Sequence, residues 1–476
     1  MDLLLIDPPR NYWGFGGGEG FFAQPLGLTT LAGFLENKQI EVDIIDCNMQ
    51  GIGWNQLKAE IQKRRPLTVG VSSAMTCFVP ASFQCLNLVK QTDPNIHTIG
   101  GGLQFSLTPE RSFEKCNSLD YIIRGDGEFT TLELLQALDK GTPKLENIKG
   151  LSFRHDGEFI HNENQEPITN LDELPFPAWH LLPMEKYRLP VVPPKWGNFA
   201  LIVTSRGCPY NCKFCSPKIA QKPHRVMSAS RAVDMLEELN IKFDTQVFWV
   251  NDLSFNVNRK RTEQFLDEII DRRLKIRMAL DGTRTDLIVR DQDLVPKMKK
   301  AGVFMVNLGV ESNSDEDLQA YNKQNKTQNS KRAVDILKKN KIHSWCFFMV
   351  GHWTHNEQDL LNILEYAKWL DPTVAIFTIT TPIPGTEYYD LMIEKGVIED
   401  QDWSHYDLAH AIMPTKHLTR EQLHNLYYKI YLGFYKRAKK IIKHVILGNP
   451  FARYTYKTQR GLGKLYNTKQ VKKGNI

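Results

Sequence analysis

The stretch Thr204-Ser-Arg-Gly-Cys-Pro-Tyr-Asn-Cys-Lys-Phe-Cys215 is the most informative part of this 476-residue sequence. Its cysteines, Cys208, Cys212 and Cys215, have the spacing C-x3-C-x2-C. Three thiolates on one short loop can hold three irons of a cubane [4Fe-4S] cluster, because each cysteine ligates one iron. The fourth iron then has no ligand from this loop. An open metal position of this kind is a place where chemistry can occur.

A structural zinc site is the alternative, with the three cysteines and His224 as its ligands. Zinc motifs usually contain two pairs of ligands separated by a longer spacer. Here the three cysteines form one group and no second pair follows them. The spacing therefore favours an iron–sulfur cluster. A disulfide is less favoured still, because three cysteines leave an odd one.

The cysteine spacing, with Gly207 before it and the aromatic Phe214 within it, resembles the radical S-adenosylmethionine (SAM) superfamily. The resemblance implies that the amino and carboxylate groups of SAM chelate the fourth iron. It also implies that the reduced cluster cleaves SAM to a 5′-deoxyadenosyl radical, which abstracts hydrogen from a substrate. An electron donor such as flavodoxin or ferredoxin would then be a partner.

Length and composition indicate a globular protein of more than one domain. The chain is 42% apolar and 24% charged, and its length exceeds that of one ordinary domain. No apolar stretch approaches the ~20 residues that span a bilayer. The start, Met1–Asp7, lacks the basic residues of a signal peptide and reads as a buried strand. Eight cysteines in a chain of this length do not form a secreted disulfide framework, so we expect a cytoplasmic protein.

Residues 1–147 are expected to form the first domain, because short apolar runs alternate with helical patterns. The expected strands are Leu3–Asp7, Val42–Cys47, Thr68–Ser73, His97–Gly101 and Tyr121–Arg124. The expected helices include Leu26–Asn37, Trp54–Arg64, Ala81–Lys90 and Thr130–Leu138. This alternation predicts a parallel, doubly wound, Rossmann-like α/β sheet. Ligands of such sheets bind beyond the carboxyl ends of the strands.

The order of strands and the glycine-rich turns of this domain resemble the cobalamin-binding domain that precedes many radical SAM domains. The resemblance implies cobalamin contacts at the strand ends, from Ser72, Ser73, Gly101, Gly102, Gln104, Gly125, Gly127 and Glu128. The D-x-H-x-x-G motif, which gives cobalt a histidine in one class of cobalamin proteins, is missing. Gln104 stands where relatives often have a histidine, so the lower ligand of cobalt is unassigned.

A dinucleotide site or a degenerate scaffold is the alternative for the first domain. The stretch Gly14–Gly20 follows the first strand and loosely resembles a phosphate loop. Aromatic residues crowd it, however, and Pro25 delays the next helix, whereas a phosphate needs a helix N-terminus close behind the glycines. A lid over cobalamin or substrate fits this stretch better.

Residues 148–197 are expected to connect two domains. The run Lys149–His161 predicts a hairpin around Asp156-Gly157. The prolines of Leu171–His180 exclude regular structure there and suit an extended strap. Trp179 and His180 are expected to pack at the domain boundary.

Residues 198–395 show a second alternation of strands and helices. The expected strands are Ala200–Ser205, Val247–Asn251, Arg277–Asp281, Phe304–Gly309, Trp345–Val350 and Ala375–Thr380. The expected helices include Arg259–Asp271, Leu294–Ala301, Ser330–Lys339 and Gln358–Trp369. This pattern predicts a partial (β/α)6 barrel. The cysteine loop follows its first strand, where barrel enzymes place their chemistry.

Four later strand ends extend the resemblance to a SAM site. It implies that Asp252 faces the amino group of SAM and that Arg284 binds its carboxylate. Glu311, with Ser312 beside it, would engage the ribose or the amine, and Phe214 would contact SAM from the cysteine loop. The turn Thr381–Thr386 would help to seat adenine. Each acidic residue taken alone fits an ordinary helix cap or ion pair equally well.

Charge is unevenly distributed along the chain. Net charge is +6, but residues 416–476 hold fifteen Lys and Arg and one acid, a balance of 15 − 1 = +14, which leaves 6 − 14 = −8 for the rest. A helix is expected over Leu418–Lys443, with a capping box at Thr419. Its apolar stripe consists of Leu423, Leu426, Tyr427, Ile430, Tyr431 and Phe434.

The C-terminal extension, residues 396–476, allows three interpretations. Docking of its helix on the barrel, with a solvated basic face, is favoured. Contact with an anionic membrane surface is the second, and nucleic-acid binding the third and unlikely one. The runs Asp407–Glu421 and Asn449–Arg453 resemble the end of the anaerobic magnesium-protoporphyrin monomethyl ester cyclase group.

These resemblances together imply a cobalamin-dependent radical SAM enzyme that methylates an unactivated carbon. Cobalamin would deliver the methyl group to the substrate radical and be remethylated by SAM. Anaerobic oxidation or cyclisation of a tetrapyrrole or lipid is the alternative, and an RNA methylthiotransferase is a weaker one. The substrate, a small molecule, lipid or tetrapyrrole, and the residues that act on it directly are not identified by the sequence.

Overall fold

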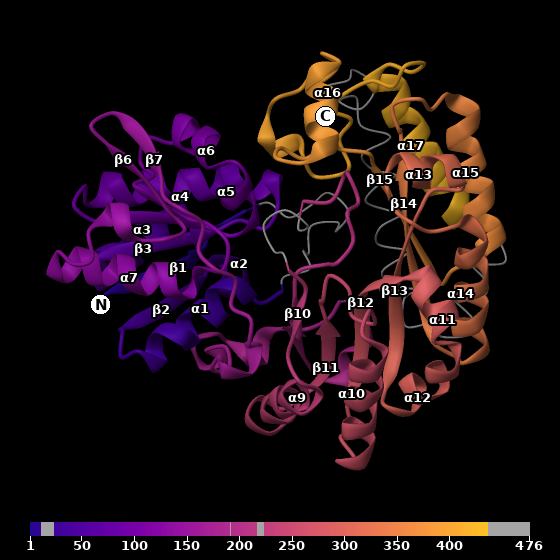
Figure 1. Cartoon of the computed structure of the whole chain (residues 1–476), viewed down its shortest axis with the longest axis horizontal. Coiled ribbons are helices and arrows are strands. Elements are labelled where there is room, and N and C mark those ends of the chain that lie inside the picture. Colours follow the sequence, from indigo (N-terminus) through magenta and orange to yellow (C-terminus); the bar gives the residue numbers. More distant parts are fainter. Residues whose placement is uncertain (11–22, 191, 217–222, 437–476) are drawn as a thin grey trace.

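Two helix-covered sheets lie side by side in the computed structural model (Figure 1). The model describes residues 1–10, 23–190, 192–216 and 223–436. The first sheet uses strands between residues 3 and 161, and the second uses strands between residues 198 and 379. Among the described residues, no helix is long and apolar enough to cross a membrane.

The first sheet has the strand order β2-β1-β3-β4-β5-β6-β7. The first five of these strands are parallel, and β6 and β7 are antiparallel. Their bounds are β1 Leu3–Asp7, β2 Val42–Asp46, β3 Thr68–Ser72, β4 His97–Gly101, β5 Tyr121–Ile123, β6 Leu151–His155 and β7 Glu158–His161. The predicted doubly wound sheet is confirmed. Its direction of winding reverses between β1 and β3, which is where such sheets bind ligands.

Helices cover both faces of this sheet because its strands are apolar on both sides. In β1, Leu3 and Leu5 join one core cluster, while Leu4 and Ile6 join the other. The first cluster includes residues of α1 and α7, and the second includes residues of α3 and α4. The helices are α1 Leu26–Asn37, α2 Cys47–Gln50, α3 Trp54–Arg64, α4 Val79–Thr92, α5 Leu103–Leu107, α6 Pro109–Lys115 and α7 Gly127–Lys140.

The predicted hairpin is confirmed as β6 and β7, and it extends the first sheet. Ile122 of β5 pairs with Ser152 of β6, so the hairpin covers the edge of β5. An open strand edge would present unpaired backbone groups, which the hairpin satisfies. The division of the chain into four segments at residues 147, 197 and 395 stays a prediction.

The second sheet is a six-stranded parallel half-barrel with the order β15-β14-β13-β12-β11-β8. Its strands are β8 Asn198–Ile202, β11 Thr245–Val250, β12 Arg277–Arg284, β13 Val303–Glu311, β14 His343–Val350 and β15 Val374–Ile379. The helices around it are α9 Ala229–Phe243, α10 Arg259–Asp271, α11 Thr285–Arg290, α12 Val295–Lys300, α13 Asp315–Ala320, α14 Thr327–Lys339 and α15 Glu357–Leu370. The predicted partial barrel is confirmed. Functional groups are expected at the carboxyl ends of its strands.

The proline-rich strap between the sheets packs on α1 through its backbone. Ala178 N donates to Thr29 O at 2.9 Å. A Cβ on Gly33 would lie 2.4 Å from Phe176 O, so the strap approaches the helix as closely as a glycine permits. Trp179 is buried, and Tyr187 OH donates to Asp46 at 2.5 Å.

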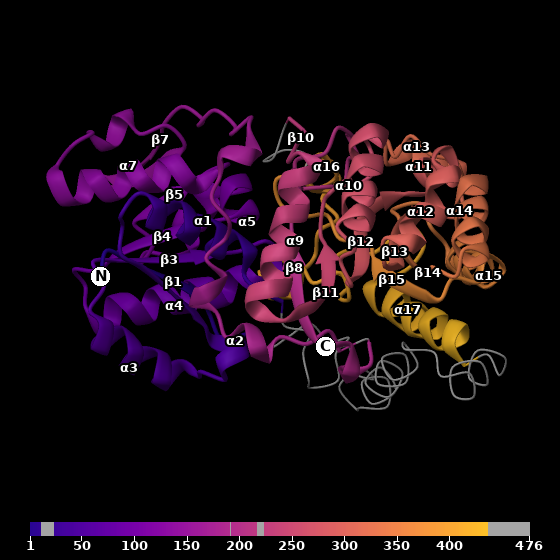
Figure 2. The same ribbon diagram turned by 90° about the horizontal axis from the view of Figure 1, so that it is seen from below.

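The segment after β15 packs against both sheets. Helix α16, Glu387–Glu394, and the residues up to Ile412 reach the first domain, where Tyr389, Trp403 and Tyr406 join a core cluster with α4 (Figure 1). Helix α17, Arg420–Tyr435, runs along α15 (Figure 2).

The predicted apolar stripe of α17 is buried, and the capping box at Thr419 and Gln422 is present. The remainder of the predicted helix lies outside the described residues, as do the Asn449–Arg453 run and the Gly14–Gly20 stretch.

We expect Gly33→Ala to destabilise the protein. The new methyl group would overlap the strap backbone, which must then move away from α1, at a cost of about 1–3 kcal/mol. Thermal unfolding of the purified protein would show this as a lower midpoint. Gly27→Ala in the same helix is the matched control, because its Cβ would lie 3.8 Å from the nearest atom, an ordinary contact. Equal midpoints for the two variants would contradict the prediction.

Candidate functional site

The three cysteines lie on a loop whose two ends are joined by a short antiparallel ribbon. The ribbon consists of β9, Ser205–Arg206, and β10, Arg225–Val226, and it pairs Arg206 with Arg225. Cys212 is buried, whereas Cys208 and Cys215 are half-buried, and none of the three forms a disulfide. The ribbon thus closes the loop at its base, at the carboxyl end of the half-barrel.

Backbone hydrogen bonds fix the middle of this loop to two neighbouring elements. Lys213 N donates to Tyr321 O at 2.9 Å, and Lys213 O accepts from Tyr388 N at 3.1 Å. Asn322 Nδ2 donates to Asn211 O at 3.0 Å. The loop is therefore held between the end of α13 and the start of α16.

Aromatic rings pack against the loop from the barrel side. Phe214 meets Tyr321 edge to face, with ring centroids 5.3 Å apart. Tyr321 in turn contacts His352 and Tyr388 at 4.9 and 6.0 Å. The contact of Phe214 with SAM stays a prediction.

Asp252 lies at the carboxyl end of β11 and fastens the strand that leads into the loop. Its carboxylate accepts hydrogen bonds from Thr204 N at 2.6 Å, Thr204 Oγ1 at 2.6 Å and Ser205 N at 3.0 Å. Asp252 is only 2% exposed. The predicted contact with the amino group of SAM is untested, and in this structure the carboxylate orients the loop.

Arg284, at the carboxyl end of β12, forms hydrogen bonds with other residues of the chain. Its guanidinium donates to Lys323 O at 2.8 Å, to Gln324 O at 2.6 Å and to the carboxylate of Asp286. It also stacks on Tyr210 of the cysteine loop, 3.8 Å from the ring centroid. The predicted contact with the SAM carboxylate would require some of these bonds to be exchanged.

Glu311 ends β13 in a left-handed conformation, with φ at 66°. Its carboxylate accepts from Lys323 Nζ at 2.7 Å, and both side chains are largely buried. A Cβ on Gly309 would lie 2.6 Å from this carboxylate, so the strand leaves room for the ion pair by having glycine there. The predicted role of Glu311 with the SAM ribose or amine is untested.

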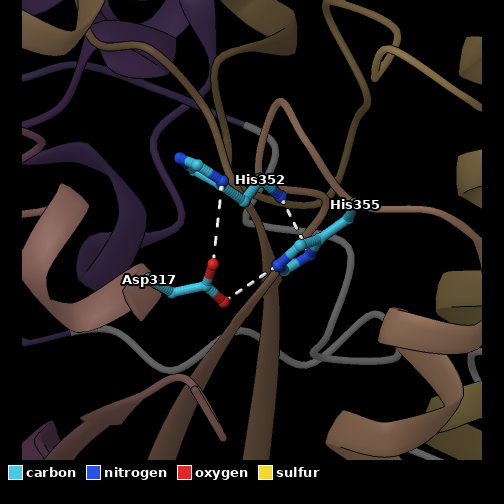
Figure 3. Close-up of side chains that lie close together, drawn as sticks. All are labelled: Asp317, His352 and His355. Atoms are coloured by element: carbon cyan, nitrogen blue, oxygen red, sulfur yellow. Dashed lines mark hydrogen bonds and ion pairs between the residues drawn. The ribbon is translucent and has the colours of Figure 1, made fainter. Parts of the chain in front are cut away.

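Ser312, a second predicted SAM contact, belongs to a buried polar cluster with Asp317, His352 and His355. Ser312 Oγ donates to Asp317 Oδ2 at 2.6 Å. His355 Nε2 lies 2.9 Å from Asp317 Oδ2, and His352 Nδ1 lies 3.8 Å from Asp317 Oδ1 (Figure 3). Burial opposes ionisation of Asp317, but the hydrogen bonds from His355 and Ser312 outweigh it and lower the pKa of that carboxyl.

The ligand-capable atoms of Asp317, His352 and His355 lie within 4.8 Å of one another, close enough to hold a metal ion. The hydrogen bonds favour a different arrangement. His352 N donates to His355 Nδ1 at 3.2 Å, so Nδ1 is an acceptor and the proton is on Nε2, which donates to Asp317. A metal-bound histidine donates a hydrogen bond through its other nitrogen, which this backbone amide does not allow.

The cysteine loop does not have the geometry of a zinc site with His224. Two ligand atoms on one zinc lie at most ~4.6 Å apart, twice a Zn–S bond. Among the described residues, the one metal-compatible group within 4.8 Å is the Asp317 cluster. The cysteines and His224 therefore do not converge as a tetrahedral zinc site requires.

Most of the predicted cobalamin residues meet at the carboxyl edge of the first sheet. Ser73 N donates to Gly101 O and Gln104 N donates to Ser73 O, each at 3.1 Å. A Cβ on Gly102 would lie 2.5 Å from Ser72 Oγ. The ends of β3 and β4 thus pack closely enough to require glycine, and they present backbone rather than side chains along this edge.

Gln104 faces the second domain. Its carboxamide accepts from Thr76 Oγ1 at 2.7 Å and donates to Thr108 Oγ1 at 3.2 Å and to Pro384 O at 3.4 Å. Pro384 lies in the turn predicted to seat adenine, so Gln104 joins the two strand edges. Its predicted contact with cobalamin is untested.

At the Arg124–Glu128 turn, where β5 leads into α7, Arg124, Gly125 and Asp126 line a cavity of about 360 Å³. Gly125 N donates to Ser106 Oγ at 3.1 Å, which joins this turn to α5. Glu128 is separate from the other predicted cobalamin residues: it is buried and pairs with Arg206 of the ribbon at 2.5 Å. The cobalamin roles of Gly125, Gly127 and Glu128 are untested.

Asp7 is a buried acidic residue at the end of β1, beside the position where the winding of the sheet reverses. Asp7 pairs with Arg10 at 2.5 Å and accepts from Asn48 Nδ2 at 2.9 Å. Burial raises the pKa of the Asp7 carboxyl to about 6, since Arg10 and Asn48 offset the desolvation only in part.

Sequence reasoning missed Asp317, Tyr321, Lys323, His352 and His355. The signal for the two histidines was present, because the spacing His352-x-x-His355 directly follows Gly351 at the end of a strand. Tyr321 and Lys323 come from the turn after α13. Tyr321 bonds the cysteine loop through its backbone, and the charge of Lys323 opposes the rise that burial causes in the pKa of the Cys212 thiol. Their sequence neighbours indicate no such contact.

Two protein-family models match the chain, one over part of each sheet. Residues 202–367 match the model of the radical SAM superfamily, and residues 19–135 match that of the B12 binding domain. The first match includes the cysteine loop. The second overturns the alternative of a dinucleotide site in the first domain.

The chain resembles curated proteins along most of its length. It is 32% identical to an uncharacterized methyltransferase of Pyrococcus horikoshii, over 98% of this chain and 99% of the relative. It is 28% identical to the anaerobic magnesium-protoporphyrin IX monomethyl ester cyclase of Rubrivivax gelatinosus, over 89% of this chain and 75% of the relative.

Solved structures share the fold. The radical SAM methyltransferase TsrM from Kitasatospora setae superposes with a TM-score of 0.69 at 19% identity, over 83% of this chain and 78% of that chain. The cobalamin-dependent SAM radical enzyme OxsB superposes with a TM-score of 0.73 at 18% identity, over 98% of this chain and 73% of that chain.

We expect Asp252→Ala to lose the cluster and Asp252→Asn to retain it. Alanine leaves three buried donors of Thr204 and Ser205 without an acceptor, at about 1–3 kcal/mol for each. Asparagine keeps one acceptor for the two amides and can donate to the Thr204 hydroxyl. Iron content after anaerobic reconstitution measures the effect, with Asp293→Ala, which removes an exposed ion pair, as the control. Full iron content in Asp252→Ala would contradict this role, and weak SAM binding by an iron-replete Asp252→Asn would support the predicted SAM contact.

We expect Asp7→Asn to stabilise the protein at pH 7.5 relative to wild type but not at pH 4. The raised pKa of Asp7 means that the folded state binds the proton more tightly than the unfolded chain. The contribution of Asp7 to the stability of wild type therefore falls as pH rises from about 4 to about 7, by about 3 kcal/mol in total. Thermal midpoints of both proteins across this range would measure the difference. A difference that does not change with pH would contradict the prediction.

Proposed function

The chain belongs to the radical SAM enzymes that carry a B12 binding domain, and we propose that it methylates an unactivated carbon of its substrate. The observation that carries the choice of methylation is the similarity to the Pyrococcus horikoshii methyltransferase along both chains. A hopanoid C-3 methylase of Methylococcus capsulatus, 25% identical over 83% of this chain, lends further support.

The cofactors of the chain are a [4Fe-4S] cluster, SAM and cobalamin. When bound, they supply an electron, a 5′-deoxyadenosyl radical and a methyl group. The residues present fit the cluster: Cys208, Cys212 and Cys215 are thiols outside any disulfide, on a loop anchored at its base and middle. They fit cobalamin because the ends of β3 and β4 present closely packed backbone at the edge where such sheets bind ligands.

The remaining side chains would hold these cofactors in a fixed geometry. Asp252 and Arg284 orient the cysteine loop through Thr204 and Tyr210. Phe214 of the loop packs edge to face on the buried ring of Tyr321, which restricts the motion of the loop on that side. A radical must react before it escapes, so rigid placement of this kind favours capture by a nearby cofactor.

Oxidation or cyclisation of a tetrapyrrole or lipid is the second candidate. The similarity to the magnesium-protoporphyrin ester cyclases favours it, as does the sequence resemblance over Asp407–Glu421. Trp403, Tyr406 and Ile412, in and just before this run, pack on the first domain. A role of the segment in substrate binding would therefore fit either reaction.

An RNA methylthiotransferase fits the described residues less well. That class would place a β-rich module at the C-terminus, whereas the described residues after β15 form helices and turns. For partners, we propose a flavodoxin or ferredoxin as electron donor. An enzyme with an oxygen-sensitive cluster would suit the reducing cytoplasm. Membrane contact through the basic residues after 436 remains a prediction.

Label transfer from SAM tests the proposal without a known substrate. Enzyme reconstituted with iron, sulfide and cobalamin is incubated anaerobically with reductant and methyl-deuterated SAM. We expect mass spectrometry to recover the deuterated methyl group on cobalamin extracted from the enzyme, because a methyltransferase must load its cobalamin from SAM. Deoxyadenosine formation with unlabelled cobalamin would instead favour the cyclase-type reaction.

Two cysteine variants control the same experiment. Cys212→Ala should abolish deoxyadenosine formation, because it removes one of the three cluster ligands. Cys116→Ala, at a buried position in the first domain, should form deoxyadenosine at the wild-type level. Deoxyadenosine formation by Cys212→Ala at the wild-type level would overturn the assignment of the cluster ligands.

A further inference from the structure

Two arginines lie side by side at the base of the cysteine loop. Arg206 of β9 and Arg225 of β10 are cross-strand partners in the ribbon. Arg206 is followed directly by Gly207 and Cys208, and Arg225 directly follows His224. The two arginines therefore bracket the whole loop that carries the cluster ligands.

Both arginines pair with carboxylates of the first domain. Arg206 contacts Asp126 Oδ1 at 3.2 Å, Glu128 Oε1 at 2.5 Å and Glu128 Oε2 at 3.3 Å. Arg225 pairs with the other oxygen of Asp126 and donates to Ile168 O at 2.8 Å. Asp126 bridges the two arginines, and Glu128 receives Arg206 in a two-pronged contact. We refer to these four residues as the arginine clamp.

The arginine clamp is buried. The Arg225 and Glu128 side chains are each 5% exposed, and those of Asp126 and Arg206 are 10% and 19% exposed. Attraction to Arg206 and Arg225 outweighs burial and lowers the pKa of Asp126. Charge-assisted bonds between planar groups fix orientation as well as distance, so the clamp can hold the ribbon in one position.

The acidic half of the clamp belongs to the carboxyl edge of the first sheet. Asp126 is the N-cap residue of α7 and lines the cavity of about 360 Å³, and Glu128 lies in the first turn of that helix. One side of the clamp is thus continuous with the edge where such sheets bind their ligand. Its other side is continuous with the cluster loop.

Other contacts join the domains without touching the cysteine loop. The strap packs on α1, Gln104 reaches Pro384, and Phe83 packs against Trp403 with ring centroids 6.2 Å apart. These contacts hold the domains together over a broad area. The clamp therefore has a more local effect: it fixes the position of the base of the loop relative to the Arg124–Glu128 turn.

We propose that Arg206 and Arg225 are positioning residues that set the distance between the cluster and cobalamin. The arginines act through Asp126 and Glu128 and need not touch either cofactor. This inference requires that both cofactors bind, but it does not depend on the choice between methylation and cyclisation.

Electron paramagnetic resonance tests the proposal directly. Holoenzyme is prepared with cob(II)alamin and a reduced cluster, both of which are paramagnetic. The cluster speeds relaxation of the cobalt signal by an amount that falls steeply with their separation. We expect Arg206→Gln to lose most of this relaxation enhancement, or to show a wide distribution of enhancements in place of a single value. The iron and cobalamin contents should stay at the wild-type level.

Arg272→Gln is the matched control for loss of ion pairs. Arg272 contacts Asp234, Glu237 and Glu268 at 2.6–3.0 Å, all within the second domain. We expect this variant to keep the wild-type enhancement, whatever its thermal stability. An equal loss in Arg272→Gln would show a general effect of stability and would overturn the proposal, as would wild-type enhancement in Arg206→Gln with both cofactors bound.

Arg206→Lys covers the case in which Arg206→Gln fails to fold or to bind a cofactor. Lysine keeps the charge but cannot make the two-pronged contact with Glu128. An altered enhancement in Arg206→Lys with both cofactors bound would support the proposal, and an unchanged one would overturn it. Neither result bears on methyl transfer, which the labelled SAM experiment tests separately.

Discussion

Burial of a guanidinium is costly unless hydrogen-bond acceptors receive its charge, and Arg206 depends on two carboxylates of the other domain for this. Without Asp126 and Glu128, the base of the cysteine loop would carry an unpaired charge in a dry environment, which is a severe cost. The position of the base of the cysteine loop therefore depends on contacts between the two domains.

The polar side chains at the strand ends form hydrogen bonds and ion pairs with other groups of the protein. Asp252 holds Thr204, Arg284 holds the turn after α13, and Glu311 neutralises Lys323. Each of these groups is buried and already has partners. The result is a rigid frame around the cluster loop, in which cofactors meet groups that are already oriented. Preorganised polar groups of this kind need little rearrangement during a reaction.

Much of the fold could be predicted from the sequence because buried parallel strands are short apolar runs with clear ends. The limits of β1, β4, α1 and α10 match their predicted limits. The joining of the hairpin to β5 could not be predicted, since a strand does not encode its neighbour. The hydrogen-bond partners of Asp252 could not be predicted either. An acidic residue at the end of a strand gives the same sequence pattern whether it accepts from SAM or from Thr204. His352 and His355 were missed because histidines at the end of a strand do not indicate their partner, and Asp317 lies far from them in the sequence.

The contact between the strap and α1 has a consequence for sequence drift. Phe176 and Ala178 meet the helix through their backbone, and the helix receives them with the bare Cα of Gly33. This contact depends on one small residue and on the course of the chain, while the side chains of Leu171, Leu174 and Trp179 are buried in the same core. Any larger side chain at position 33 would therefore displace the strap backbone, whichever side chains the strap carried at positions 176 and 178.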